Sequence, residues 1–169
     1  MSYPRFAAMI GLSTVVMFGL MYLNTYALDH VTYSQTRTWM AVVMGAAMAI
    51  VMLAFMWSMY SNVRANIAII AASVIAFSGA LWLVRSQETV DEVSYMKAMI
   101  PHHSIAVLTS ERALIRDQRV RQLADEIIEA QLREIAEMKR LIAELEANPV
   151  LEEASRLPPS GTRAGPAAN

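Results

Sequence analysis

Three long apolar stretches in the first half of the chain constrain its fold more than any other feature. Each is close to the roughly 20 residues that a helix needs to cross a hydrocarbon layer of about 30 Å. The stretches are residues 6–23, 39–60 and 67–84. A backbone exposed to lipid must satisfy its own hydrogen bonds, and helices do so. The sequence therefore predicts three transmembrane helices in contact with a lipid bilayer.

Charge and aromatic residues predict how these helices lie in the membrane. Amphipathic rings such as Tyr22, Trp39 and Trp82 mark their ends, as expected at the headgroup boundary. Three spans put the N-terminus and the second half of the chain on opposite sides. The positive charges flanking the spans nearly balance, and the terminal amine tips the N-terminus towards the inside. We expect an integral protein of the inner or plasma membrane whose C-terminal domain is extracytoplasmic.

The second half of the chain has a composition that suits water. Between residues 6 and 84 the formal charges are Asp29, Arg37 and Arg64, whereas charges recur every few positions after Ser86. The 169 residues carry a net charge of -1 and no basic run, which excludes nucleic-acid binding. There is no cysteine, so a soft metal ion would have to be bound by methionine or histidine.

Helical periodicity continues in the second half. Apolar residues repeat at helical spacing over about 88–115 and 118–147, interrupted by the polar pair Arg116 and Asp117. So short a connection predicts two antiparallel helices. The expected fold is all-α, with a transmembrane region at 1–86, a soluble hairpin at 87–147 and a disordered, proline-containing tail at 148–169.

Each hairpin helix carries a seam of residues that alternate steps of three and four, which is typical of packed helices. The first seam contains Met96, Met99, His103, Ala106, Ser110 and Ala113, and the second contains Val120, Ala124, Ile127, Gln131, Glu134, Met138, Leu141 and Leu145. Counted from Asp117, His103 and Gln131 are both fourteen positions away. Antiparallel pairing should therefore bring polar and sulfur-containing side chains to one level.

This convergence predicts a metal site. Burying an unpaired polar group costs about 1 to 3 kcal/mol, so several together indicate mutual hydrogen bonding or a bound ion. Imidazoles and thioethers suit soft or borderline cations, copper foremost and other divalent metals as alternatives. The candidate ligands are Met96, Met99, His102, His103, Gln131, Glu134 and Met138.

Two residues complicate this site. His102 points about 100° away from His103 on a helix, so one of the two histidines is expected to serve a second subunit or to support the ligands. Pro101 removes a backbone donor within the helix and predicts a kink near the carbonyl of Lys97. Outside the hairpin, His30 in the first linker could approach a metal, but we expect Asp29 and His30 to form an ordinary solvated loop pair.

The candidate ligands and their neighbours in the hairpin resemble the domain-of-unknown-function family 305, a ferritin-like group of helical proteins. The resemblance spans about 90–142 and is carried by Asp91, Tyr95, Met96, residues 99–103, Ala106, residues 123–124 and 127–128, Gln131, Glu134, Ile135 and Met138. It implies a ferritin-like half-bundle with an extracytoplasmic, copper-binding site of methionine and histidine. In the family a methionine often follows the histidine pair, where this chain has residues 108–110 without one, so the resemblance implies weaker copper binding here.

Three hypotheses for function remain open. The first is a non-enzymatic, membrane-anchored protein that binds copper for buffering, tolerance or hand-over to a transporter or chaperone. It is expected to be a homo-oligomer, because a lone hairpin buries little apolar surface. The second is a structural protein whose hairpin mediates oligomerisation or docks on a transporter. The third, a ferritin-like di-metal oxidase, is disfavoured because the sequence has no Glu-x-x-His pair.

A row of methionines in the second span allows two interpretations. Its members recur at every fourth position and are Met40, Met44, Met48, Met52 and Met56. Thioethers in such a row could pass a soft cation through the membrane. Flexible methionines also commonly fill gaps between helices, and this interpretation is favoured.

Overall fold

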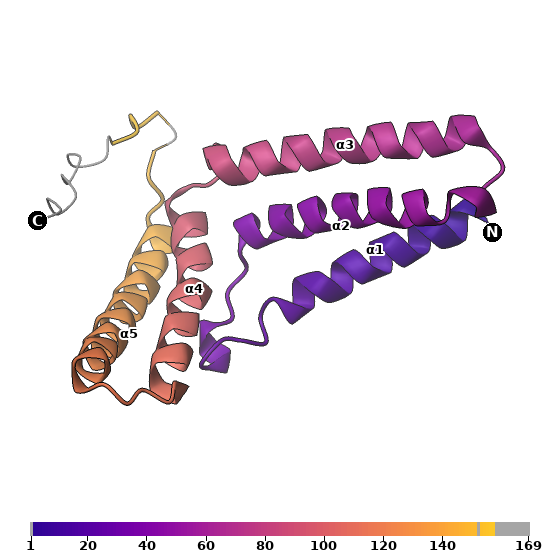
Figure 1. Cartoon of the computed structure of the whole chain (residues 1–169). Helices are drawn as coiled ribbons and strands as arrows, with labels where there is room; N and C mark the ends of the chain where they lie inside the picture. The colour runs from indigo at the N-terminus through magenta and orange to yellow at the C-terminus, as the bar shows by residue number, and fades with distance from the viewer. Residues whose placement is uncertain (1, 152, 158–169) are drawn as a thin grey trace, which may run out of the picture.

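The computed structural model describes residues 2–151 and 153–157, and every regular element within them is helical (Figure 1). The α-helices are α1 (Tyr3–Leu20), α2 (Gln35–Phe55), α3 (Val63–Ser86), α4 (Glu92–Arg112) and α5 (Gln118–Ala147). Short 3-10 turns, η1 (Leu28–His30) and η2 (Trp57–Met59), follow α1 and α2. The predicted all-α class, with three apolar helices before an antiparallel hairpin, is confirmed. Most of the predicted tail, residues 152 and 158–169, lies outside the described residues.

The first three helices are each long and apolar enough to cross a membrane. In Figure 1 they lie side by side, with α2 in contact with both α1 and α3. Only 6% of the apolar window of α1 and 11% of that of α3 are buried within the chain, as expected of helices whose apolar side chains face lipid. Ser34 and Asn62 cap the starts of α2 and α3 by accepting hydrogen bonds from backbone N–H groups, so both helices begin four residues before the predicted stretches.

Small side chains set the spacing between α1 and α2. The face of α2 turned towards its neighbours buries Gly45 together with several alanines. A β-carbon at Gly45 would collide with the side chain of Thr14 on α1. The hydroxyl of Thr14 is held because it donates a hydrogen bond of 2.8 Å to the carbonyl of Ile10. The close approach of these two helices therefore requires glycine at this position.

The methionine row of α2 lies beside this small-residue face. Met52 and Met56 pack against the buried cluster that contains Phe6 and Leu53. Met40, at the other end of the row, is partly exposed. Packing therefore accounts for part of the row, while passage of a cation along it stays a prediction.

The hairpin is held together by an apolar core between α4 and α5. Its buried members are Met96, Ile100, Ile135, Met138 and Ile142. Asp91 and Asp117 cap the two helices by accepting hydrogen bonds from the backbone N–H groups of their first turns. The core is rotated relative to the predicted seams, which did not include the three isoleucines. One cause is that α4 also buries Ser104, whose hydroxyl bonds to the linker between α1 and α2, so the buried residues of α4 lie to one side of the predicted seam.

The side of α4 that carries Ser104 packs against the linker between α1 and α2. The hairpin lies across one end of the three apolar helices, with α4 between α5 and the linker (Figure 1). Ser104 Oγ accepts a hydrogen bond from the Tyr26 N–H at 2.7 Å and lies 3.0 Å from Nδ1 of His30. Thr32 Oγ1 donates to the carbonyl of Lys97 at 2.6 Å. From α5, Lys139 Nζ donates to Asp29 Oδ2 at 2.6 Å. His30 is buried, so the expected solvated pair is wrong for this residue.

Pro101 makes one of these contacts possible by leaving a carbonyl of α4 without its helical donor. It has no N–H, so the carbonyl of Lys97 lacks the helical hydrogen bond that residue 101 would otherwise donate. The helix nevertheless runs on through Pro101 from Glu92 to Arg112. The hydroxyl of Thr32 takes the place of the missing donor. The carbonyl of Lys97, left without a helical donor, thus accepts a hydrogen bond from the linker.

The chain turns from the three apolar helices into the hairpin at Gln87. This residue adopts a left-handed backbone conformation with φ of 53° and ends α3, its N–H bonding to the carbonyl of Leu83. Residues 88–90 then lead into α4. The hairpin is therefore joined to the three apolar helices by this covalent connection as well as by the linker contacts.

Candidate metal-binding groove

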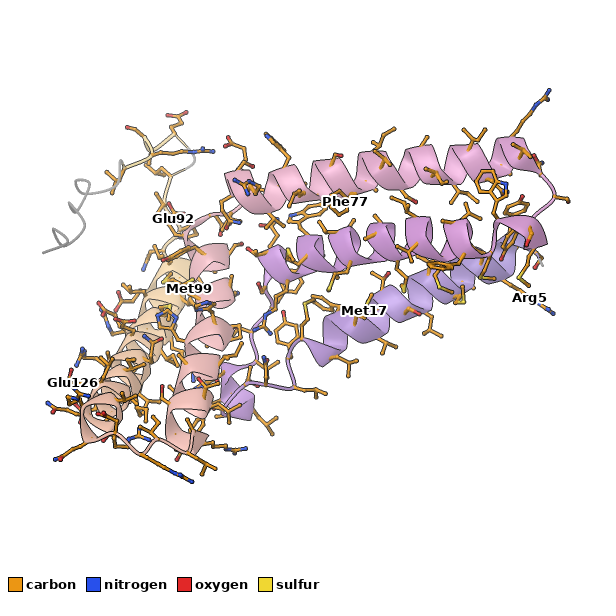
Figure 2. The ribbon with its side chains drawn as sticks, viewed as in Figure 1. Arg5, Met17, Phe77, Glu92, Met99 and Glu126 are labelled. Carbon is orange, nitrogen blue, oxygen red and sulfur yellow. The ribbon has the colours of Figure 1, made fainter. Side chains whose placement is uncertain are left out.

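An open groove of about 1520 Å³ runs along the hairpin between α4, α5 and the segments before and after them. Five of the seven predicted ligands line it: Met96, Met99, His103, Glu134 and Met138. Figure 2 labels Met99 where α4 and α5 face each other. The other two are not part of its lining, since His102 is exposed and Gln131 is half-buried elsewhere on the hairpin.

His103 is the central polar group of the groove. Its Nδ1 lies 3.0 Å from the carbonyl oxygen of Met99, one turn earlier on α4, and its Nε2 lies 2.8 Å from Oε2 of Glu134 on α5. A carbonyl oxygen can only accept, so Nδ1 carries a hydrogen. The ring is thereby held with Nε2 directed at the carboxylate. An ionised carboxylate also only accepts, so this contact is favourable when Nε2 carries a proton or when a cation is bound there.

The partner of His103 differs from the predicted one. Symmetry about Asp117 predicted Gln131, whereas the structure pairs His103 with Glu134, three residues further on. The connection explains the shift, because α4 ends at Arg112 and the following residues are not helical. An extended residue advances about twice as far as a helical one. Consequently α5 starts beyond the end of α4 and its first two turns overhang it.

The sulfur groups differ in their burial. Met96 and Met138 belong to the hairpin core, while Met99 is half-buried at its edge. The rings of His102 and His103 are 6.0 Å apart and meet edge to face. His103 thus lies close to thioethers on one side of α4, and His102 points outward from the hairpin.

Carboxylates dominate the charge of the groove. Its lining includes Glu88, Asp91, Glu92, Glu134 and Glu137, against the single guanidinium of Arg156. Arg156 is itself paired with Glu88 at 3.1 Å. Such an excess of negative charge in a concave surface raises the local concentration of cations.

One chain supplies an incomplete set of hard or borderline ligands. Among residues 2–151 and 153–157, no three side chains of His, Cys, Asp or Glu come together in a way that could hold a metal ion. His103 and Glu134 form a pair, and the remaining donors at the groove are thioethers. A cation bound by one chain would therefore depend on sulfur ligands or on groups from another molecule.

The docking residues were missed from the sequence. Ser104 is fully buried and bonds to both the backbone of Tyr26 and the ring of His30. A small polar residue on an otherwise apolar helix face was one available signal. The carbonyl freed by Pro101 was another, since a buried acceptor requires a donor from elsewhere.

The family comparison covers the hairpin and the segment that follows it. Residues 92–167 match the family described as Domain of unknown function (DUF305). The match begins at the first residue of α4 and leaves out α1 to α3, which confirms the family resemblance for this part of the chain. The ferritin-like and copper-binding character that the resemblance implies stays a prediction.

A viral protein and the solved structures complete the comparison. An uncharacterized protein of Acanthamoeba polyphaga mimivirus is 39% identical over 66 residues, which are 38% of this chain and 43% of that protein. The chain thus matches less than half the length of this relative. No solved structure matches the chain.

Proposed function

We propose that this chain is a membrane-anchored metal-binding protein whose hairpin binds copper on the extracytoplasmic side, for buffering, tolerance or hand-over. One observation carries the proposal. The ring of His103 is held by the carbonyl of Met99 so that Nε2 faces Glu134 in an acidic groove that thioethers also line. A histidine whose second nitrogen is fixed by a carbonyl is the usual arrangement of a metal ligand.

The donor types favour copper over harder metals. Thioethers bind soft cations such as Cu(I), and imidazole binds copper in both oxidation states. His103 would provide Nε2, and Met96, Met99 and Met138 would provide sulfur. Glu134 would balance the charge or complete the ligand set. Zinc sites need three or four nitrogen, thiolate or carboxylate ligands, which the groove of a single chain does not offer.

A docking function is the second candidate. Several large apolar side chains at the free end of the hairpin are exposed, among them Leu114, Val120 and Leu123. In that case the polar seam residues would set the register with a partner helix. A di-metal oxidase is less consistent with the groove, where His103 contacts a single carboxylate.

Metal titration tests the proposal directly. Purified full-length protein is titrated with Cu(I) against a competing chelator, beside His103→Ala and the matched control His102→Ala. We expect affinity to fall at least about tenfold in His103→Ala, equivalent to roughly 1.4 kcal/mol or more, and to fall less in His102→Ala. Equal and negligible binding by the wild-type protein and His103→Ala would refute copper binding and favour the docking function.

A further inference from the structure

Hydrogen bonds spaced along one side of α4 tie that helix to the linker between α1 and α2. The hydroxyl of Thr32 donates to the carbonyl of Lys97, and the N–H of Tyr26 donates to Ser104. The hydroxyl of Tyr26 donates in turn to Glu111, at 3.4 Å. The three positions on α4 are seven residues apart, close to two helical turns, so the contacts recur on one side of the helix over about 21 Å. Most of α4 therefore runs beside the linker.

The linker sets the level of α4 relative to the bilayer of the proposed function. α1 ends at Leu20 and α2 begins at Gln35, and both helices are long and apolar enough to be membrane spans. Residues that join two spans lie at the headgroup boundary. The exposed side chains of this linker include amphipathic rings and leucines, which are typical of that boundary: Leu23, Tyr26, Leu28 and Tyr33. Because α4 is bonded along this linker and lies between it and α5, α4 faces the membrane surface (Figure 1).

The free end of the hairpin carries an apolar side chain that the described residues leave uncovered. Residues 112–121 form this hairpin tip. Within it Leu114 is 94% exposed, and in the linker Leu28 is 90% exposed. The bond between Tyr26 and Glu111 brings the segments that carry these two leucines together. An apolar surface that continues from a membrane linker onto a neighbouring loop fits an apolar phase on that same side, which lipid supplies.

The hairpin tip is also positively charged. It holds four arginines and one acidic residue. Two of the arginines are neutralised within the chain, because Arg119 and Arg121 pair with carboxylates at 2.8 and 2.7 Å. The side chains of Arg112 and Arg116 are exposed and have no ion pair among residues 2–151 and 153–157. Two free guanidinium groups beside an exposed leucine are suited to the phosphates of an anionic leaflet.

The sign of this charge disfavours a second copy as the partner of the tip. Two copies meeting tip to tip would bring their free guanidinium groups together, which is destabilising. The charge also differs from that of the groove, whose lining includes Glu88, Asp91 and Glu92. The hairpin is therefore polarised along its length, and its basic end is the one that suits an anionic membrane.

We propose that α4 lies along the membrane surface and that the hairpin tip binds the headgroups of an anionic leaflet. Leu114 enters the interface, while Arg112 and Arg116 contact lipid phosphates. The hairpin is then held at both ends, by the covalent connection at Gln87 and by lipid at the tip. This inference rests on the membrane anchoring in the proposed function and is independent of copper.

A fluorescence depth measurement tests the tip in the full-length protein, because the natural chain has no cysteine to compete for the label. Leu114→Cys is labelled with NBD and reconstituted in nanodiscs of phosphatidylcholine, alone or with an equal part of phosphatidylglycerol. The quenchers are lipids spin-labelled at the headgroup or along the acyl chain. Glu129→Cys, exposed on the face of α5 opposite its buried residues, is the control for a label in water. Ile75→Cys, on the exposed side of α3, reports whether the apolar helices are embedded.

We expect headgroup quenching and blue-shifted emission at Leu114 in the phosphatidylglycerol nanodiscs, well above the level at Glu129. Combining Arg112→Gln with Arg116→Gln should lower the ratio of bound to free tip about fivefold for each arginine removed. Arg133→Gln, which replaces an exposed arginine of α5, is the matched control and should change this ratio little.

The outcomes separate the tip from the anchor. Quenching at Leu114 no greater than at Glu129, with Ile75 quenched, would overturn the tip proposal and leave the anchoring in place. Failure of acyl-chain quenching at Ile75 would overturn the anchoring itself. Quenching at Leu114 that is equal in both lipids and in the double variant would overturn the role of the two arginines.

Discussion

The hydroxyl of Thr32, in the linker between α1 and α2, donates a 2.6 Å hydrogen bond to the carbonyl oxygen of Lys97 on α4. These residues are far apart in the sequence and belong to the two halves of the chain with opposite composition. The acceptor is available because Pro101 cannot donate to it. Proline in α4 therefore contributes to the attachment of the hairpin to the three apolar helices.

A double-mutant cycle should show this dependence. Thr32→Val removes the donor with little change in shape, and we expect it to weaken docking by about 1 to 3 kcal/mol because an acceptor is left unpaired. In a Pro101→Ala background residue 101 supplies the missing N–H, so the same change should cost less than half as much. Hydrogen exchange of the Tyr26 amide, which is bonded to Ser104, reports docking. Equal costs in the two backgrounds would contradict this role of Pro101.

Replacing Ser104 should loosen the same contact more broadly. Ser104→Ala leaves the Tyr26 N–H and the His30 ring without their partner, at a cost of about 1 to 3 kcal/mol. Thermal unfolding of the full-length protein in detergent measures the loss. Thr109→Ala is the control, since that hydroxyl is exposed and bonds within its own helix. An equal loss of thermal stability in both variants would show that Ser104 has no special part in docking.

Docking should weaken in mild acid. Burial, reinforced by the nearby charge of Lys139, lowers the pKa of His30, and Asp29 opposes this effect. The folded state thus disfavours the protonated ring, so its contribution is complete above the unfolded pKa of about 6.5 and decreases as the pH falls below that value. The hydrogen bond from Lys139 also lowers the pKa of Asp29, whose contribution is lost only in stronger acid, below about pH 4.

Exchange of the Tyr26 amide between about pH 7 and 5 measures this effect, after correction for intrinsic rates. We expect protection to decrease across that interval in the natural chain. His30→Asn keeps a polar side chain but cannot titrate there, so its protection should be lower and independent of pH. A pH dependence that survives in His30→Asn would assign the effect to another group.

Packing between α1 and α2 can be tested at Gly45. Gly45→Ala introduces a β-carbon against Thr14, so we expect a loss of about 1 to 3 kcal/mol in the packing of α1 on α2. Adding Thr14→Ala removes the hydroxyl and methyl groups in the way and should restore part of that loss. Gly11→Ala, where no neighbouring atom lies in reach of the new methyl group, is the control. Thermal unfolding in lipid bicelles compares the four proteins.

Features that depend on local spacing could be predicted from the sequence. Length and apolar content identified the three apolar helices, and helical periodicity identified the hairpin and five of the seven predicted ligands that line its groove. The pairing of His103 was displaced by one helical turn because the connection is extended. The buried face of α4 differs from the predicted seam because α4 packs against both α5 and the linker, and helical periodicity does not show that a helix has a second neighbour. Asp29 and Lys139, 110 residues apart, meet only through the folded arrangement of both halves.

Attachment at two points limits how the hairpin can move. A domain on a single tether swivels, whereas one held at two separate points cannot turn unless one attachment breaks or the support itself moves. The hairpin is joined covalently through Gln87 and noncovalently through residues 26–32. A change in the angle between α1 and α2 would move those linker residues and, through their hydrogen bonds, rotate α4. The orientation of the hairpin would therefore follow the packing of the helices that hold it.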